Sequence, residues 1–480
     1  MLILPIFIPI IAGILLPILK PERKTRRWYV TAVTAVTAVI AVAAAAASDG
    51  AVTLFRITEE LTISFAADKI SLFFAAVICV TWLITAVYSY EYMEHEGAED
   101  RFYGFYLATL GVLIGLSFAS NLVTLYLFFE CVTFAAVPLV LHSLKKEAVS
   151  AALKYLFYSV FGALLALFGV FFIWHFSAGH DFILGGVIDP QAIAGHEKVF
   201  HAAVFLMIVG FGTKAGMYPM HGWLPTAHPV APAPASALLS GIIAKAGIIA
   251  VVRVVYYTVG AEYIAGTWVQ TVWMILALVT VFMGSIMAYK EDLLKKRLAY
   301  STVSNISYIM LGLACLTPAG LVGALTHVAA HAAAKVTLFC AAGSIILREG
   351  KTHVSELEGI GKRMPLTMWA FTLASLSLIG IPPFAGFVSK WFIAVAAVSG
   401  DYGAFSVLIP AVLLVSALLT AGYLLPPVIN GFFPKKGYDY SQPKTEAPPV
   451  MTAPMLLLSI IGLLLGVFGQ ALFNWLSLII

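Results

Sequence analysis

Residues 200–253 read FHAAVFLMIVGFGTKAGMYPMHGWLPTAHPVAPAPASALLSGIIAKAGIIAVVR, which places Lys214 and Lys245 inside apolar segments. The first of these segments is interrupted beside its lysine by three helix-breaking residues, Gly212, Gly216 and Pro219. A charged side chain near the centre of a bilayer costs at least about 2.5–3.5 kcal/mol, so it normally faces a bundle interior, a partner or water. We therefore expect both lysines to have a role inside a bundle of membrane helices.

The composition of the whole chain supports this setting. Of 480 residues, 61% are hydrophobic and only 11% are charged, which excludes a soluble globular protein and indicates a polytopic membrane protein. The formal net charge of +4 gives no reason to expect a nucleic-acid partner. The four cysteines are isolated in apolar surroundings, without the spacing of metal or cluster ligands, so we expect packing roles and no metal site.

Runs of roughly 17–25 apolar residues predict an all-α fold of about fourteen transmembrane helices. The first begins at Met1 without a small-residue cleavage signal, which favours a retained helix over a removed signal peptide. The expected ranges are 3–19, 28–48, 69–90, 102–118, 121–142, 153–176, 200–219, 235–260, 267–289, 298–316, 320–347, 366–398, 404–429 and 452–478.

Lysine and arginine residues give the orientation of these helices. Most of them fall in alternate loops, such as residues 20–27, 290–297, 348–363 and 435–444. The loops between them hold only Arg56, Lys69 and Lys198. Because cytoplasmic loops of membrane proteins are enriched in these residues, we expect both termini on the outer side of a prokaryotic plasma membrane.

Two of the predicted helices, the seventh and the twelfth, are each broken by glycine and proline beside a lysine. The second break contains Pro382 and Pro383, and Lys390 follows it. An offset of five helices reverses the direction of crossing, as two inverted five-helix repeats require. The predicted division is residues 1–90, three helices; 102–260, the first repeat (helices 4–8); 267–430, the second repeat (helices 9–13); and 451–480, the last helix.

Glu130 lies about nine residues, or roughly 14 Å, into the fifth predicted helix, too deep to reach the interface easily. One reading is a structural carboxylate bonded to a neighbouring helix. The functional reading pairs it with Lys214, since burial destabilises a lysine's charged form and a nearby carboxylate stabilises it.

Lys245 lies about ten residues into the eighth predicted helix, again near the middle of the membrane. A lysine desolvated there can gain and lose a proton, whereas an arginine stays charged. Arg253 lies eight residues further along, roughly 12 Å nearer the outer side. It either reaches the interface beside Tyr256 and Tyr257 or shapes the exit of an ion path.

Three titratable residues share one face of the eleventh predicted helix. His327, His331 and Lys335 follow each other at intervals of four residues, or about 6 Å. A lone buried histidine is usually part of a packed core, but three such groups in file indicate a proton relay. The spacing of the two histidines would also fit a zinc pair, but no Glu lies between them and no third ligand is evident nearby. Lys390 either completes the series or reaches an interface.

These residues carry a resemblance to a known family. The stretch of residues 214–253, with HVAAHAAAK and IGIPPFAGFVSK, resembles the antiporter-like membrane subunits shared by respiratory complex I, Mrp sodium/proton antiporters and energy-converting membrane-bound hydrogenases. The resemblance implies a fourteen-helix inverted-repeat fold. It also implies roles for the residues that match the family motifs: Glu130, Lys214, Lys245, His327, His331, Lys335 and Lys390. We count Arg253, His221 and His228 as accessory candidates.

Two departures limit what the resemblance implies. Many members carry Asp where this chain has Thr226, and one short complex I subunit carries Glu at the position of Lys390. The chain also ends after its fourteenth predicted helix, as in the shorter subunits of the family.

The sequence therefore predicts a proton-translocating subunit, with sodium as an alternative ion, of a redox-driven complex related to complex I or to membrane-bound hydrogenases. No catalytic residue or cofactor is expected in this chain, and flavin and iron–sulfur clusters would belong to partner subunits. Expected partners are other membrane subunits, including further antiporter-like ones, and the lipid bilayer. The alternatives are a subunit of an Mrp-type antiporter and a structural or quinone-binding scaffold without its own ion path.

Overall fold

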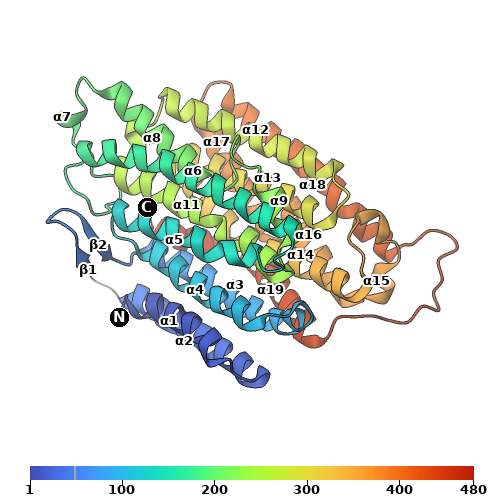
Figure 1. Ribbon diagram of the computed structural model, residues 1–480. Coiled ribbons are helices and arrows are strands. Elements are labelled where there is room, and N and C mark those ends of the chain that lie inside the picture. Colours follow the sequence, from blue (N-terminus) through green and yellow to red (C-terminus); the bar gives the residue numbers. More distant parts are fainter. Residues whose placement is uncertain (48–49, 480) are drawn as a thin grey trace.

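The computed structural model describes residues 1–47 and 50–479 as a bundle of helices with one β-hairpin (Figure 1). Within the described residues, ten helices are long and apolar enough to cross a membrane. They are α2 (Arg23–Ala47), α3 (Lys69–Glu96), α4 (Glu99–Phe118), α5 (Leu122–Val140), α6 (Lys146–Phe176), the composite helix Ala233–Val259, α12 (Trp268–Lys290), α14 (Pro318–Glu349), α18 (Phe405–Phe432) and α19 (Pro449–Val467).

The remaining helices are shorter or interrupted. Three apolar ones are α1 (Leu4–Leu19), α16 (Pro365–Ile379) and α17 (Ala385–Ser399), and two further long ones are α8 (Glu197–Gly212) and α13 (Leu294–Ala314). The short ones are α7 (Pro190–Ile193), α9 (Leu224–Val230), η3 (Ala261–Tyr263), η4 (Val354–Glu356), α15 (Ile360–Arg363) and α20 (Gly469–Ser477). Every range predicted as helical overlaps a helix of the structure, although predicted ends at residues 48 and 480 lie outside the described residues.

The β-hairpin departs from the predicted all-α fold. Strands β1 (Val52–Arg56) and β2 (Thr62–Phe65) pair antiparallel, with Val52 opposite Phe65 and Arg56 opposite Thr62. Valine, threonine, isoleucine and phenylalanine favour strands, and the five-residue loop is a common hairpin length. These strands are too short to form the long apolar runs from which the helices are predicted.

The centre of the bundle is formed by the composite helix and α14. The composite helix consists of α10 (Ala233–Leu238), η1 (Leu239–Ile243), α11 (Lys245–Val252) and η2 (Arg253–Val259), and η1 and η2 are π-helical. Its apolar window is completely buried, and that of α14 is 89% buried. The charged residues Lys245, Arg253 and Lys335 on these two helices are therefore shielded from lipid by the surrounding helices.

Both predicted helix breaks are present in the structure. Helix α8 ends at Gly212 and turns follow, in which Gly216 has a φ of 75° and the Tyr218–Pro219 bond is cis. Helix α16 ends at Ile379, and α17 begins at Ala385 after a cis Pro382–Pro383 bond. The backbone groups that these breaks release need polar partners inside the membrane.

Candidate functional site

Lys214 lies in the turn directly after α8 and is completely buried. Its ammonium group donates hydrogen bonds to the Phe129 carbonyl oxygen at 3.1 Å and to Thr133 Oγ1 at 2.5 Å, both on α5. It also lies 4.4 Å from the centre of the Phe129 ring. The released Thr213 carbonyl accepts a bond from the Trp223 indole at 3.0 Å, so the break beside the lysine is satisfied internally.

Glu130 follows Phe129 on α5, so it belongs to the helical turn that Lys214 contacts. The two charges interact electrostatically, but no ion pair within 4.0 Å joins them in the described part of the chain. Glu130 Oε1 is buried without a hydrogen-bond partner among the described residues. The structure thus shows the predicted pair in an open arrangement, with Thr133 holding the lysine.

Lys245 begins α11, and only Ala244 separates it from the π-helical segment η1. Its Nζ donates to the Ser240 carbonyl oxygen at 2.6 Å, and it lies 2.6 Å from His331 Nδ1 on α14. Lys245 is 2% exposed and His331 is completely buried. This contact joins the two central helices through two titratable side chains that are 86 positions apart in the chain.

On α14 the row of titratable residues continues from His331 to His327, and the centres of these two imidazole rings lie 6.1 Å apart. His327 Nδ1 lies 2.8 Å from Ser389 Oγ on α17, and Ser389 directly precedes Lys390. The Tyr308 ring, on α13, lies 5.4 Å from the His327 ring and 4.8 Å from Lys390 Nζ. The structure therefore brings four of the predicted residues, Lys245, His331, His327 and Lys390, into one continuous cluster.

Lys390 has a structural task as well. Its Nζ donates to the carbonyl oxygens of Leu378 at 2.6 Å and Ile379 at 3.0 Å, at the end of α16. A cation at the C-terminus of a helix satisfies free carbonyls and the helix dipole. Lys390 thus caps the broken helix, rather than reaching an interface.

Lys335, the third member of the predicted file, is completely buried and points to α13, where its Nζ donates to the Leu298 carbonyl at 2.9 Å. The accessory histidines differ from each other. His221 is partly exposed and stacks on Tyr218, whereas His228 is completely buried against Phe339. Neither ring nitrogen of His228 has a hydrogen-bond partner within the described residues.

Arg253 forms a bidentate pair with Asp68, with N–O distances of 2.6 and 2.8 Å, and donates to Ser71 Oγ at 2.9 Å. Asp68 also caps α3 by accepting from the Ser71 backbone N–H at 2.8 Å. The guanidinium lies 4.6 Å from the Tyr257 ring centre. Arg253 therefore ties the composite helix to the start of α3 and does not contact the lysine and histidine cluster.

Sequence reasoning missed the hydroxyl residues of the site: Thr133, Ser240, Tyr308 and Ser389. One signal was available in the polar run STVSNISY of α13, which places Thr302 and Tyr308 between the basic start of that helix and its apolar end, IMLGLA. Thr302 Oγ1 lies 2.7 Å from Ser240 Oγ, and Tyr308 donates to Ser416 Oγ at 2.5 Å. Among the described residues, no group of three or more His, Cys, Asp or Glu side chains is arranged to hold a metal ion.

The chain matches two known protein families, in agreement with the geometry of the site. The family described as NADH:quinone oxidoreductase/Mrp antiporter, TM, matches residues 119–420, which is more than half of the chain. The N-terminus of complex I chain 5 matches residues 57–103. The chain belongs to the NADH:quinone oxidoreductase/Mrp antiporter family.

Individual members of this family agree with that assignment. The chain is 33% identical to NADH-quinone oxidoreductase subunit N of Desulforudis audaxviator over 406 residues, 82% of this chain and 79% of that protein. It is 27% identical to a Na(+)/H(+) antiporter subunit of Alkalihalophilus pseudofirmus, covering 86% of this chain and 82% of that one. Its fold matches a chain of the Mrp complex from Dietzia sp. DQ12-45-1b with a TM-score of 0.85 and 23% identity, covering 100% and 96% of the two chains. This chain is thus an antiporter-like, multi-pass membrane subunit.

Proposed function

We propose that this subunit moves protons across the membrane along the buried lysine and histidine residues, within a larger membrane complex driven by redox chemistry. The observation that carries the proposal is the 2.6 Å contact between Lys245 and His331, which continues through His327 and Ser389 to Lys390. Such a row of titratable groups in a bundle interior is costly and is typical of proton pathways.

The first step of the path lies at Lys214. A proton from the cytoplasm loads this lysine, and closing of the gap to Glu130 stabilises its charged form. At an effective dielectric constant near 20, two unit charges about 4 Å apart interact by roughly 4 kcal/mol. The open arrangement of Glu130 and Lys214 corresponds to the state in which this attraction is weak and the proton leaves toward Lys245.

The second step runs through the central cluster. The Lys245 ammonium passes a proton to His331 Nδ1, and the resulting imidazolium releases one from Nε2 toward His327. The 6.1 Å between the ring centres is a span that a bridging water closes. From His327 the proton reaches Lys390 through Ser389 or beside Tyr308, and it leaves to the outer side. Lys335 holds a positive charge beside Lys245 or takes up a second proton.

The proposal includes a membrane arrangement of fourteen spans in two inverted five-helix repeats, with both termini on the outer side. Support comes from the two lysine-bearing breaks, at Gly212 and at Ile379, which occupy equivalent places in the two predicted repeats. Further antiporter-like subunits and the redox subunits, with flavin and iron–sulfur clusters, complete the complex.

The test replaces Lys245 by Met in the assembled complex, with Lys198→Met at the exposed start of α8 as the matched control. Proton transfer by a positioned group contributes a factor of about 100 or more, so we expect Lys245→Met to reduce proton uptake by inverted vesicles at least about tenfold. The control should pump normally. Pumping at the full rate by an assembled Lys245→Met complex would contradict the relay and favour a scaffold; loss of assembly on native gels would make Lys245 structural.

A second candidate is a subunit of an Mrp-type sodium/proton antiporter, favoured by the 27% identity to the Na(+)/H(+) antiporter subunit of Alkalihalophilus pseudofirmus. The purified complex distinguishes the two. Flavin and iron–sulfur absorbance supports the redox-driven complex, and sodium-dependent proton exchange without these chromophores supports the antiporter.

A further inference from the structure

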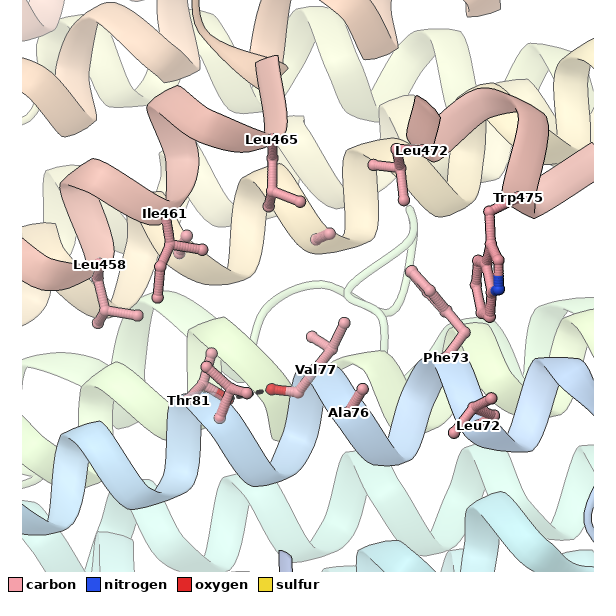
Figure 2. Close-up of a pocket in the computed structure, with 13 residues that line it drawn as sticks. Leu72, Phe73, Ala76, Val77, Thr81, Leu458, Ile461, Leu465, Leu472 and Trp475 are labelled. Atoms are coloured by element: carbon pink, nitrogen blue, oxygen red, sulfur yellow. Dashed lines mark hydrogen bonds between the residues drawn. The ribbon is translucent and has the colours of Figure 1, made fainter. Parts of the chain in front are cut away.

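A groove of about 290 Å³ lies between α3, α14 and the last two helices, α19 and α20 (Figure 2). Val77 and Ala76 of α3 face Ile461 and Leu465 of α19 across it. Its lining is apolar except for the indole N–H of Trp475 at one end and for Thr81, whose hydroxyl donates to the Val77 carbonyl oxygen at 2.6 Å. The groove therefore offers hydrocarbon contacts along most of its length.

One end of the groove carries a positive charge and an indole ring. Trp475 of α20 lines this end together with Leu72, and the exposed Lys69 lies one turn before Leu72 at the start of α3. Lys69 Nζ donates one hydrogen bond to the Leu478 carbonyl oxygen at 2.5 Å, which holds the ammonium beside α20. Tryptophan and lysine together are typical of the level of lipid headgroups.

The depth of the groove matches one leaflet of a bilayer. Its wall on α3 extends from Leu72 to Thr81, nine residues or about 14 Å at 1.5 Å per residue. The hydrocarbon core of a bilayer is about 30 Å thick, so the groove reaches from the headgroup level to roughly the midplane.

We propose that this groove is a binding site for an anionic phospholipid, with one acyl chain between α3 and α19 and the phosphate on Lys69. The positive charge of Lys69 and the apolar wall below it match the two parts of such a lipid. Its tail also contacts Ala329 and Ala333 of α14. Ala329 lies two positions from both His327 and His331, about 200° around the helix, so the lipid supports the face of α14 opposite the histidines.

The test measures lipid retained by the complex after purification from membranes or nanodiscs containing phosphatidylglycerol and phosphatidylcholine in equal amounts. Two variants address the two parts of the site: Lys69→Gln removes the charge, and Ala76→Phe fills the groove. Their matched controls both lie on α8: Lys198→Gln at its exposed start and Ala202→Phe on its exposed face. Size-exclusion chromatography and native gels verify that each variant assembles.

We expect native mass spectrometry to show retained phosphatidylglycerol in the parent complex and in both controls. A lysine near an anionic headgroup is worth about a factor of five in binding, so Lys69→Gln should lower phosphatidylglycerol retention by about that factor. Ala76→Phe should reduce it by about tenfold or more, because several buried methylene groups lose their contacts. Equal retention in Ala76→Phe and the parent, equal retention of the two lipids, or recovery of a quinone in place of phospholipid would overturn the proposal.

Discussion

The buried lysines share one kind of partner, which is a main-chain carbonyl oxygen. Lys214, Lys245, Lys335 and Lys390 each donate to at least one carbonyl, which lies on a neighbouring helix, at a helix end or, for Lys245, one π-helical turn earlier in the same composite helix. A carbonyl dipole stabilises an ammonium without a full negative charge, so loss of the proton leaves no unpaired carboxylate in the membrane. This arrangement suits a group that changes its charge during each cycle.

The pair of Arg253 and Asp68 differs from these lysines, because it combines full charges at the edge of the membrane. Burial raises the pKa of Asp68, but the Arg253 guanidinium and hydrogen bonds from Arg253 and Ser71 outweigh it and hold the pKa below its ordinary value. A carboxyl with a lowered folded-state pKa contributes stability that is complete above its unfolded pKa, about 3.9 for aspartate, and is lost as the pH falls through the folded value.

We therefore predict that the melting temperature of the purified complex decreases as the pH falls below about 4, and that Asp68→Asn reduces this dependence. At pH 7 the variant should already be less stable, since it leaves the buried Arg253 without its ion-pair partner. Asp189→Asn, at a short exposed helix, is the control. A pH dependence of Asp68→Asn equal to that of the parent would contradict the assignment.

The residues that sequence reasoning identified and those it missed differ in the range of their contacts. The intervals between His327, His331 and Lys335 lie within one helix, so the 3.6-residue period of the helix predicts their common face. The contacts of Lys245 with His331 and of His327 with Ser389 join residues 86 and 62 positions apart. Such contacts depend on how the helices pack against one another, and the spacing of residues along the chain does not indicate this packing.

At the scale of elements, glycine and proline predicted both helix breaks but not the π-helical segments of the composite helix. Segment η1 ends at Ile243, two positions before Lys245, and η2 begins at Arg253. A π-helical turn widens the helix and shifts the side chains that follow it. Here Ser240, inside the segment, accepts a hydrogen bond from Lys245 Nζ through its carbonyl oxygen, and no residue type in LSGII signals this in advance.

Close packing of α11 on the end of α8 places the two lysine-bearing segments side by side. A Cβ atom on Gly247 would lie 2.5 Å from the Phe211 carbonyl oxygen and 2.8 Å from the Ala215 nitrogen. Both neighbours are main-chain atoms, so the helices would have to move apart. The glycine thus sets the spacing between Lys245 and the turn that holds Lys214.

We predict that Gly247→Ala destabilises the protein by about 1–3 kcal/mol, as overpacking does in other cores, and lowers the melting temperature of the complex. Proton uptake should fall with it, because the helices of Lys214 and Lys245 separate. Gly179→Ala is the matched control, since a Cβ atom there meets nothing within 4 Å. An unchanged melting temperature in Gly247→Ala would show that the contact is not close enough to separate the helices.

At the scale of the whole molecule, the two ends of the bundle differ in the segments that they carry. The hairpin lies at one end and the loop before α19 at the other (Figure 1). Helix α1 begins at the hairpin end, because Ile6 packs on Gly111 and Gly13 on Gly104, so α1 runs antiparallel to α4, and the Phe118 carbonyl at the end of α4 accepts a hydrogen bond from Ala66. Lys69 of α3 holds Leu478 at the same end. The two ends of the described chain thus lie on the hairpin side.

The basic loops gather at the opposite end. Arg363 pairs with Glu349 at 2.7 Å, and its carbonyl accepts a hydrogen bond from the Thr445 backbone. The count of lysine and arginine residues in each loop predicted this grouping, because the composition of the loops indicates the orientation of a membrane protein. The hairpin was not predictable in the same way, since its strands are too short to give a membrane signal.

We predict that the basic end faces the cytoplasm. In a chain whose four native cysteines are replaced by alanine, Ala194→Cys lies in an exposed position after α7 and Ser441→Cys lies in the exposed basic loop. A membrane-impermeant maleimide added to spheroplasts should label the first and not the second, and inverted vesicles should give the opposite result. Positive loops resist transfer across a membrane whose inner side is negative, so the orientation follows from their charge. Labelling of Ser441→Cys in intact spheroplasts would show that the basic end faces outward. The proposed topology would then be wrong, and Lys214 and Lys390 would each face the opposite side of the membrane.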